Sequence, residues 1–376
     1  MPKDTSMDLD QFATKIRKTG FVLENRVAIE LKRAGWTVIS NKYYEDDFEG
    51  SVREIDLLAY KVSKIQHIDV YTTLLISCKK NESNVWALLA RDINLKDPNS
   101  DWWPLHAWSN DKPLMYELTQ IGRSKIYHDE VKTLFGVSEA LSIPDVEVFA
   151  FQEMKRSDGS PQNDKNIFSA VTSLMKAQAY ELSSLSQRKK AAAVYQFNLL
   201  SVIDSDLIRL KFTGDEIKAE PINSEHYIAR YIIKKKESFS RVRFLTAASF
   251  NTSLEDYNRL HAANCQWFER TYNNFFDEAI KDWKRTEVFI EEFREKLRWS
   301  LFWRLKRDFN KSYNTNILSL DWKSKENRLA VTLSVDSEVL EFLNGDDETR
   351  KAVEKALKEI YRYTGDFYFA EDDLPF

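Results

Sequence analysis

The chain has 376 residues with a formal net charge of −4, and 43% of the residues are hydrophobic. This length and composition predict one or two folded domains with a sizeable core, and they exclude a compositionally disordered chain. The charge provides no global basic field for nucleic acid, although a local groove can be basic on an acidic protein.

The sequence indicates neither a targeting segment nor a zinc site. Its first residues are polar and charged, unlike a signal peptide, and no apolar run approaches the ~20 residues that a membrane span needs. Two cysteines, Cys78 and Cys265, and five scattered histidines provide no disulfide framework and no zinc-ligand spacing. We therefore expect a soluble protein of the reducing cytoplasm.

The first 80 residues predict a helix followed by three strands. Apolar residues recur at helical spacing over residues 20–34, and Gly35 is the expected C-cap. Strands are expected over residues 36–44, 53–62 and 70–80. The third is mostly apolar and rich in β-formers, as expected of a strand buried on both faces.

The middle of the chain alternates between helices and strands. Residues 83–110, rich in Trp and broken by prolines, predict a short helix followed by irregular structure. Helices are expected over residues 115–135 and 167–190, with a strand at 145–154 and a loop at 155–166. Four further strand-like segments would extend or flank the sheet: residues 192–204, 207–214, 226–235 and 241–249.

The character of the sequence changes near residue 252. A helical region dense in aromatic residues is expected over residues 254–313, followed by a hairpin and a helical segment at 337–363. The predicted fold class is mixed α/β, with a core sheet flanked by helices and then a helical and α+β C-terminal domain. The predicted parts are two domains and an acidic tail: residues 1–252, 253–365 and 366–376.

Charged side chains in the first 80 residues suggest a site for phosphodiester chemistry. Glu24 lies on the predicted helix, Asp56 in the second strand, and Lys79 near the end of the third. Hydrolysis of a phosphodiester needs a divalent metal, and Mg²⁺ prefers carboxylate oxygens. A nearby lysine can orient the attacking water or stabilise the charge that develops on the phosphate. Residues 77 and 79 are two apart on a strand and share a face.

This pattern resembles the PD-(D/E)XK nuclease superfamily, and in particular its Mrr-like and restriction-endonuclease-like members. The matching segments are GFVLE with Glu24, REIDLLAY with Asp56, LLISCKK with Lys79, and Trp86 beyond them. The resemblance covers residues 20–90. It implies a restriction-endonuclease-like core and a metal-dependent DNA endonuclease, in which Asp56 binds Mg²⁺ or Mn²⁺ with help from Glu24. By analogy with similar proteins, it also suggests a bacterial restriction or anti-phage defence system.

One position departs from the family pattern, because Ser77 stands where a second acid is expected. The metal could be held by Asp56, Glu24, backbone carbonyls and water, or a carboxylate could come from Glu54 or Glu153. The alternative is a catalytically inactive nuclease-like fold that binds DNA or a protein partner. Each site residue taken alone also has a structural explanation. Glu24 and Lys79 could be solvated surface charges, and Asp56 could form a structural salt bridge.

Two further segments suggest partners. The last residues resemble the acidic C-terminal tip of bacterial single-stranded DNA-binding proteins, which docks on replication and repair enzymes. The matching residues are Asp372, Asp373, Leu374, Pro375 and Phe376. The alternative is an acidic tail that is frayed or packed on its own domain. The basic stretch over residues 296–311 could follow a phosphate backbone with Trp299 and Trp303 as stacking platforms, or it could be core on one face and solvated on the other.

Overall fold

The computed structural model describes residues 9–46, 50–310, 314 and 318–372. It confirms the mixed α/β class. Contacts divide the chain into two units, which are described separately below. The first contains residues 1–111 and 118–268, and the second contains residues 112–117 and 269–376. The expected boundary after residue 252 falls near the start of a long helix, α6 (Phe250–Glu278).

The main sheet of the first unit has the strand order β1-β2-β3-β7-β11-β10, with β5 also paired to β7. The first three strands are antiparallel neighbours, whereas β3, β7 and β11 run parallel to one another. The expected order of a helix over residues 20–34 followed by three strands is therefore confirmed. The strands are β1 (Thr37–Glu45), β2 (Val52–Ile65), β3 (Ile68–Lys80), β5 (Ala107–Ser109), β7 (Ala193–Asp204), β10 (Ser224–Ile233) and β11 (Lys236–Thr246).

A second sheet of the first unit corrects two expectations. It has the order β6-β4-β8-β9, comprising β4 (Asn84–Asp92), β6 (Val146–Lys155), β8 (Leu207–Thr213) and β9 (Glu216–Ile222). The prediction of a short helix after residue 83 was wrong, because β4 pairs with β6 on one side and β8 on the other. Strand β8 belongs to this sheet instead of extending the main one, and its hairpin partner β9 was not expected.

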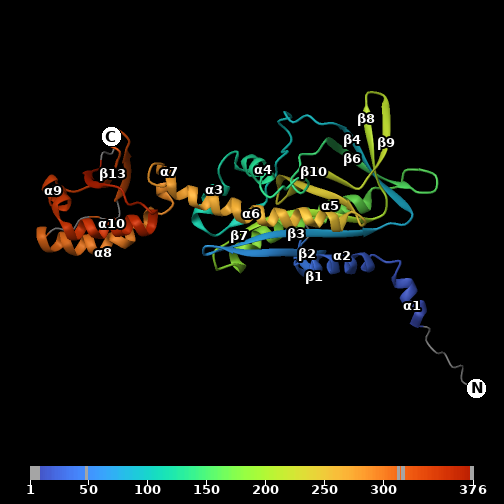
Figure 1. The fold of residues 1–376 in the computed structure, drawn as a ribbon, viewed down its shortest axis with the longest axis horizontal. Coiled ribbons are helices and arrows are strands. Elements are labelled where there is room, and N and C mark those ends of the chain that lie inside the picture. The colour runs from blue at the N-terminus through green and yellow to red at the C-terminus, as the bar shows by residue number, and fades with distance from the viewer. Residues whose placement is uncertain (1–8, 47–49, 311–313, 315–317, 373–376) are drawn as a thin grey trace, which may run out of the picture. The chain divides into compact units, whose positions relative to one another are not determined.

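Helices α5 (Lys165–Arg188) and α6 cover opposite faces of β3 (Figure 1). Leu75 of β3 shares a hydrophobic cluster with Leu174 and other residues of α5. Its near neighbour Thr72 instead accepts a hydrogen bond from Asn264 of α6, with Oγ1 and Nδ2 2.8 Å apart. Because side chains alternate between the faces of a strand, the two helices bury different sides of it.

The remaining helices of the first unit flank this core. Helix α2 (Phe21–Arg33) ends as expected, with Gly35 just beyond it in a left-handed conformation at φ 81°. It packs against β1, β2 and β3. The expected helix over residues 115–135 is two helices: α3 (Lys112–Leu118), which belongs almost entirely to the second unit, and α4 (Arg123–Thr133) of the first unit. Gly122 has φ 78° at the start of α4. The first described helix is α1 (Leu9–Ile16).

The second unit contains a three-stranded sheet and four further helices within the described residues. Its sheet has the order β12-β13-β14 and buries a separate hydrophobic cluster with the helices. The expected hairpin is confirmed, and the expected helical segment is split at Asp346. The elements are α7 (Trp283–Glu287), α8 (Ile290–Phe309), β12 (Ser319–Lys323), β13 (Arg328–Leu333), α9 (Ser337–Gly345), α10 (Asp347–Tyr361) and β14 (Phe367–Glu371).

Strand β14 changes the expectation for an acidic tail that begins at residue 366. It pairs in parallel with β13 from Phe367 to Glu371, so these residues belong to the sheet. Asp372 is the last described residue. Asp373, Leu374, Pro375 and Phe376 lie outside the described residues, and the resemblance to a docking tip stays a prediction. Among the described helices, none combines the length and the apolar character that crossing a membrane requires.

Candidate functional site

Asp56 lies where strands β2 and β3 separate. The paired part of the two strands ends at Leu57 and Ile76, one residue from Asp56. Beyond that point the backbone amide of Cys78 donates a hydrogen bond to the Asp56 carboxylate, with N and Oδ2 2.6 Å apart. The side chain thus occupies the fork between the strands, and its charge is stabilised by a backbone amide.

Two side chains of β3 meet the same carboxylate oxygen. The Ser77 hydroxyl donates to Asp56 Oδ2 over 3.3 Å, and the Lys79 Nζ lies 3.9 Å from that atom. Ser77 is fully buried, whereas Asp56 and Lys79 keep 23% and 30% of their side-chain surface exposed. The structure therefore brings together Asp56, Ser77 and Lys79, and it leaves the carboxylate and the ammonium accessible to a substrate.

Glu24 stands within electrostatic reach of this group. Burial raises the pKa of Glu24, the negative charge of Asp56 raises it further, and the positive charge of Lys79 opposes both. Its position in the first turn of α2 would by itself favour the ionised form. The net effect is a raised pKa: the Glu24 carboxyl group holds its proton more tightly than usual, first because it is partly buried and second because the Asp56 carboxylate lies nearby.

The structure separates the two candidates for an additional carboxylate. Glu54 accepts a hydrogen bond from Asn41 and is close enough to Glu24 to raise its pKa. Glu153 is buried, and its Oε2 accepts hydrogen bonds from Asn81 and Asn84 over 2.7 and 2.9 Å. Glu153 thus fixes the connection between β3 and β4, whereas Glu54 lies on the side of Glu24.

The donors near Asp56 suit a small hard cation that keeps much of its own water. Within the described ranges, no group of three or more His, Cys, Asp or Glu side chains is arranged to hold a metal ion. Mg²⁺ is commonly bound by one or two carboxylates together with water and substrate phosphate. Asp56 and Glu24 provide two carboxyl groups within electrostatic reach of each other, and a cation held by both would relieve their repulsion.

The residues next to the motif serve the fold. The Lys80 ammonium donates to the backbone carbonyl of Arg17 over 2.9 Å and lies 3.0 Å from Glu82 Oε1. The Lys80 ammonium is thereby engaged away from Asp56, unlike that of Lys79. Trp86 is fully buried, and its ring packs edge-on against Phe244 at a centroid distance of 6.1 Å. The Trp of the motif is therefore a core residue.

A groove that the sequence patterns did not indicate opens at the carboxyl ends of the parallel strands. It has a volume of about 480 Å³, and Lys80, Asp204 and Thr246 mark the ends of β3, β7 and β11 along it. The carboxyl edge of parallel strands is a frequent place for ligands in α/β sheets. Three strand segments that are distant in the sequence form this edge, so no local motif could reveal it. Lys80, which lines the groove, is the residue that follows Lys79 in the chain.

Helix α8 of the second unit carries the basic and aromatic stretch. One face is core, with Phe293, Leu297 and Leu301 buried. On its surface, Trp299 and Trp303 each leave 64% of their area exposed. Several of the basic side chains form ion pairs within the unit; the Arg304 guanidinium, for example, pairs with Asp346 and Glu348. The exposed indole rings, which both contact Phe302, are thus aromatic groups that this surface offers for recognition.

No protein-family model, curated protein or solved structure matches the chain.

Proposed function

We propose that the first unit is a metal-dependent phosphodiester hydrolase that cleaves DNA, with Asp56 and Lys79 at its centre. The observation that carries the proposal is their geometry: the Cys78 amide fixes the Asp56 carboxylate, and the Lys79 ammonium lies 3.9 Å from it. A carboxylate and a lysine that lie side by side where two strands separate, both accessible, are the groups that metal-assisted hydrolysis of a phosphodiester requires.

Each residue has a distinct task in this proposal. Asp56 and Glu24 would hold Mg²⁺ or Mn²⁺, which when bound polarises the phosphate and acidifies a water. The Lys79 ammonium would orient the attacking water and balance the negative charge that develops on the phosphate. The Ser77 hydroxyl, which donates to Asp56 Oδ2, keeps the carboxylate in place without supplying a charge of its own.

DNA is the proposed partner, and the exposed Trp299 and Trp303 of α8 are proposed to add base stacking in the second unit. Bacterial DNA would be met in the cytoplasm, the compartment that a chain with only two cysteines, Cys78 and Cys265, favours. A role in restriction or anti-phage defence stays part of the proposal and rests on analogy with similar proteins.

The second candidate is an inactive nuclease-like fold that binds DNA or a protein partner. The neutral Ser77 at the position of the expected second acid favours it. In this case the Asp56 carboxylate would be retained to close the fork between β2 and β3, through its bonds to Cys78 and Ser77.

Cleavage assays distinguish the two candidates. The full chain would be incubated with supercoiled plasmid and Mg²⁺ or Mn²⁺ beside Asp56→Asn and Lys79→Ala variants. The matched control is Lys64→Ala, an exposed lysine on β2. We expect nicking or linearisation by the parent and the control only. Cleavage that persists in both site variants would remove the site assignment, and a parent that binds plasmid without cutting it would favour the inactive fold.

A further inference from the structure

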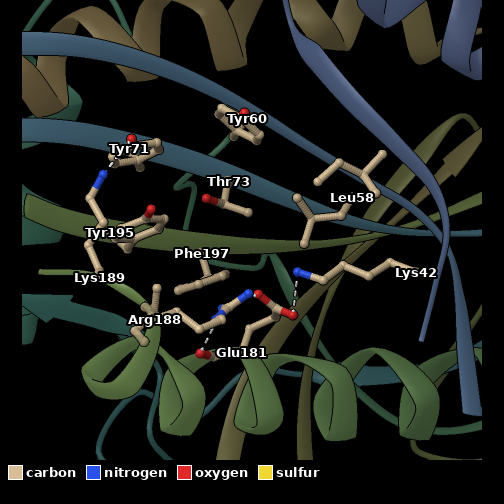
Figure 2. A pocket seen from close by; sticks show the side chains of 12 residues that line it. Lys42, Leu58, Tyr60, Tyr71, Thr73, Glu181, Arg188, Lys189, Tyr195 and Phe197 are labelled. Carbon is tan, nitrogen blue, oxygen red and sulfur yellow. Dashed lines mark hydrogen bonds and ion pairs between the residues drawn. The ribbon is translucent and has the colours of Figure 1, made fainter. Parts of the chain in front are cut away.

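A cavity of about 220 Å³ lies between the main sheet and helix α5, and it shares no lining residue with the Asp56 site (Figure 2). It is formed by side chains of β1, β2, β3 and β7 on one side and by the last turns of α5 with Lys189 on the other. Its volume is below the ~300 Å³ at which pockets for drug-sized ligands begin. The cavity is partly open to solvent, so a ligand larger than this volume would bury one part in it and leave another part outside.

Aromatic rings from three neighbouring strands stand along one side of this cavity. Tyr71 and Tyr195 are stacked, with their centroids 4.1 Å apart and their planes 2° from parallel. Tyr60 continues the row on β2, and the Phe197 ring lies nearly parallel to Tyr195. Planar ring systems gain contact area and favourable offset stacking against such a row. The cavity is therefore suited to a planar ring.

Basic side chains outnumber acidic ones around the same cavity. Lys42, Arg188 and Lys189 line it together with a single carboxylate, Glu181. The Lys42 and Arg188 side chains each approach one oxygen of Glu181, over 2.8 and 2.7 Å, as Figure 2 shows. Lys189 in turn lies 3.4 Å from Asp69 Oδ2 and donates to the Tyr71 hydroxyl over 2.8 Å. Three cations thus meet two carboxylates, and the excess of one positive charge favours an anion in the cavity.

Thr73 provides an independent indication of a ligand. Its side chain lines the cavity and is 98% buried, with 2% of its surface exposed. Within the described part of the chain, its Oγ1 has no hydrogen-bond partner. A buried hydroxyl without a partner is costly, so a polar group delivered from the cavity would stabilise it. The neighbouring Thr72 shows the usual situation, since its Oγ1 bonds to His261 and Asn264.

We propose that this cavity binds a nucleoside monophosphate. The base would lie against the tyrosine row and bond to the Thr73 hydroxyl, and the phosphate would meet the cations at the α5 side. The combination of a planar ring, one hydrogen-bonding edge and one anionic group matches the three features of the cavity. This site goes beyond the proposed nuclease function and does not depend on it.

Calorimetric titration of the full chain tests the proposal. The probes are adenosine 5′-monophosphate and thymidine 5′-monophosphate, with adenosine and inorganic phosphate as comparators, in EDTA so that no divalent metal contributes. We expect saturable binding of a monophosphate and weaker binding of adenosine and of phosphate alone. Absence of saturable binding of both monophosphates, or phosphate alone binding as tightly, would overturn the proposal.

Two variants and one control locate the binding. Thr73→Val removes the hydroxyl, and because Oγ1 has no partner among the described residues, the variant should fold as stably as the parent. It should weaken monophosphate binding about three- to tenfold, and Arg188→Gln should weaken it at least about tenfold. Lys64→Gln, outside the cavity, should leave binding unchanged. Unchanged affinity in both Thr73→Val and Arg188→Gln would refute this assignment of the cavity.

Discussion

The backbone amide of Cys78 lies 2.6 Å from the Asp56 carboxylate, although the two residues are 22 positions apart. The bond forms just past the last backbone pair of β2 and β3, at Leu57 and Ile76. The Asp56 side chain therefore closes the fork between two strands and also presents a charge at their end. Asp56 thus has a structural role and a proposed catalytic role. Substitutions of Asp56 must be chosen so that the two roles can be measured separately.

Asp56→Asn and Asp56→Ala should differ in stability while both lose DNA cleavage. The amide oxygen of Asn can still accept the bond from the Cys78 amide, whereas Ala leaves that amide without its partner. Loss of a partner by a buried polar group costs about 1–3 kcal/mol. We expect urea denaturation to give Asp56→Ala a free energy of unfolding about 1–3 kcal/mol lower than that of Asp56→Asn. Equal stabilities would show that the bond does not hold the fork.

Ser77→Asp should make stability depend on divalent metal. The new carboxylate would be buried beside Asp56, because the Ser77 hydroxyl now lies 3.3 Å from Asp56 Oδ2. Two adjacent carboxylates repel each other unless a cation lies between them. The melting temperature should fall in EDTA and rise again with Mn²⁺, and the uncharged Ser77→Ala variant should not respond. A melting temperature unaffected by Mn²⁺ would argue against a cation site there.

Glu24→Gln should raise stability at neutral pH when no metal is present. Burial and the charge of Asp56 raise the pKa of Glu24 above its usual 4.5. An acid whose pKa is raised in the folded state favours folding below its unfolded pKa and loses that contribution as the pH rises through the folded one. The advantage of Glu24→Gln should thus appear above pH 4.5 and grow until the folded pKa is passed. Chemical denaturation at several pH values measures it, and saturating Mg²⁺ should reduce the gain. A variant less stable than the parent in EDTA at pH 7 would contradict this electrostatic account.

His128 should make the protein sensitive to mild acid. Burial, together with the charge of Arg241, lowers the pKa of His128 to about 3. A base with a lowered folded pKa contributes stability above its unfolded pKa of 6.5 and loses it as the pH falls toward 3. The loss for this residue should reach about 2 kcal/mol at pH 5.

A Gln at position 128 tests this effect. The Gln amide can still donate to the Pro104 carbonyl, which lies 3.1 Å from His128 Nε2, but it does not titrate. The stability of His128→Gln, measured by chemical denaturation, should vary less between pH 7 and pH 5 than that of the parent. Lys64→Gln, at an exposed lysine on β2, is the control and should keep the parent profile. An unchanged slope in His128→Gln would exclude His128 as the source of acid sensitivity.

Replacing Trp299 and Trp303 together by Ala should weaken binding of single-stranded DNA. Both rings are 64% exposed, and stacking of a base on an aromatic side chain contributes about 1–3 kcal/mol. Trp283 is similarly exposed, at 69%, but lies on α7, so Trp283→Ala is the matched control. Fluorescence anisotropy with a labelled oligonucleotide measures the effect. Equal losses in the double variant and in the control would show that α8 has no particular role.

Local patterns were sufficient to predict the early elements and the candidate residues. The order of α2, β1, β2 and β3 follows from hydrophobic periodicity and β-forming residues, which act over a few positions. The common side of Ser77 and Lys79 follows from the two-residue repeat of a strand. The same patterns failed for β4, whose apolar residues suit either a helix or a buried strand. Its pairing with β6 and β8, both more than 50 positions away, decided between them.

The amino-acid sequence by itself determined which charged residues lie on which strands. Only the tertiary structure decided that the Cys78 amide binds Asp56, that Glu153 fixes a strand connection, and that Tyr60, Tyr71 and Tyr195 line one cavity. These contacts join residues that are distant in the sequence and meet only when the sheet is assembled, so local secondary-structure propensity cannot predict them. The physical reason is that propensity and periodicity act over a few residues, whereas hydrogen bonding and burial act wherever packing brings atoms together.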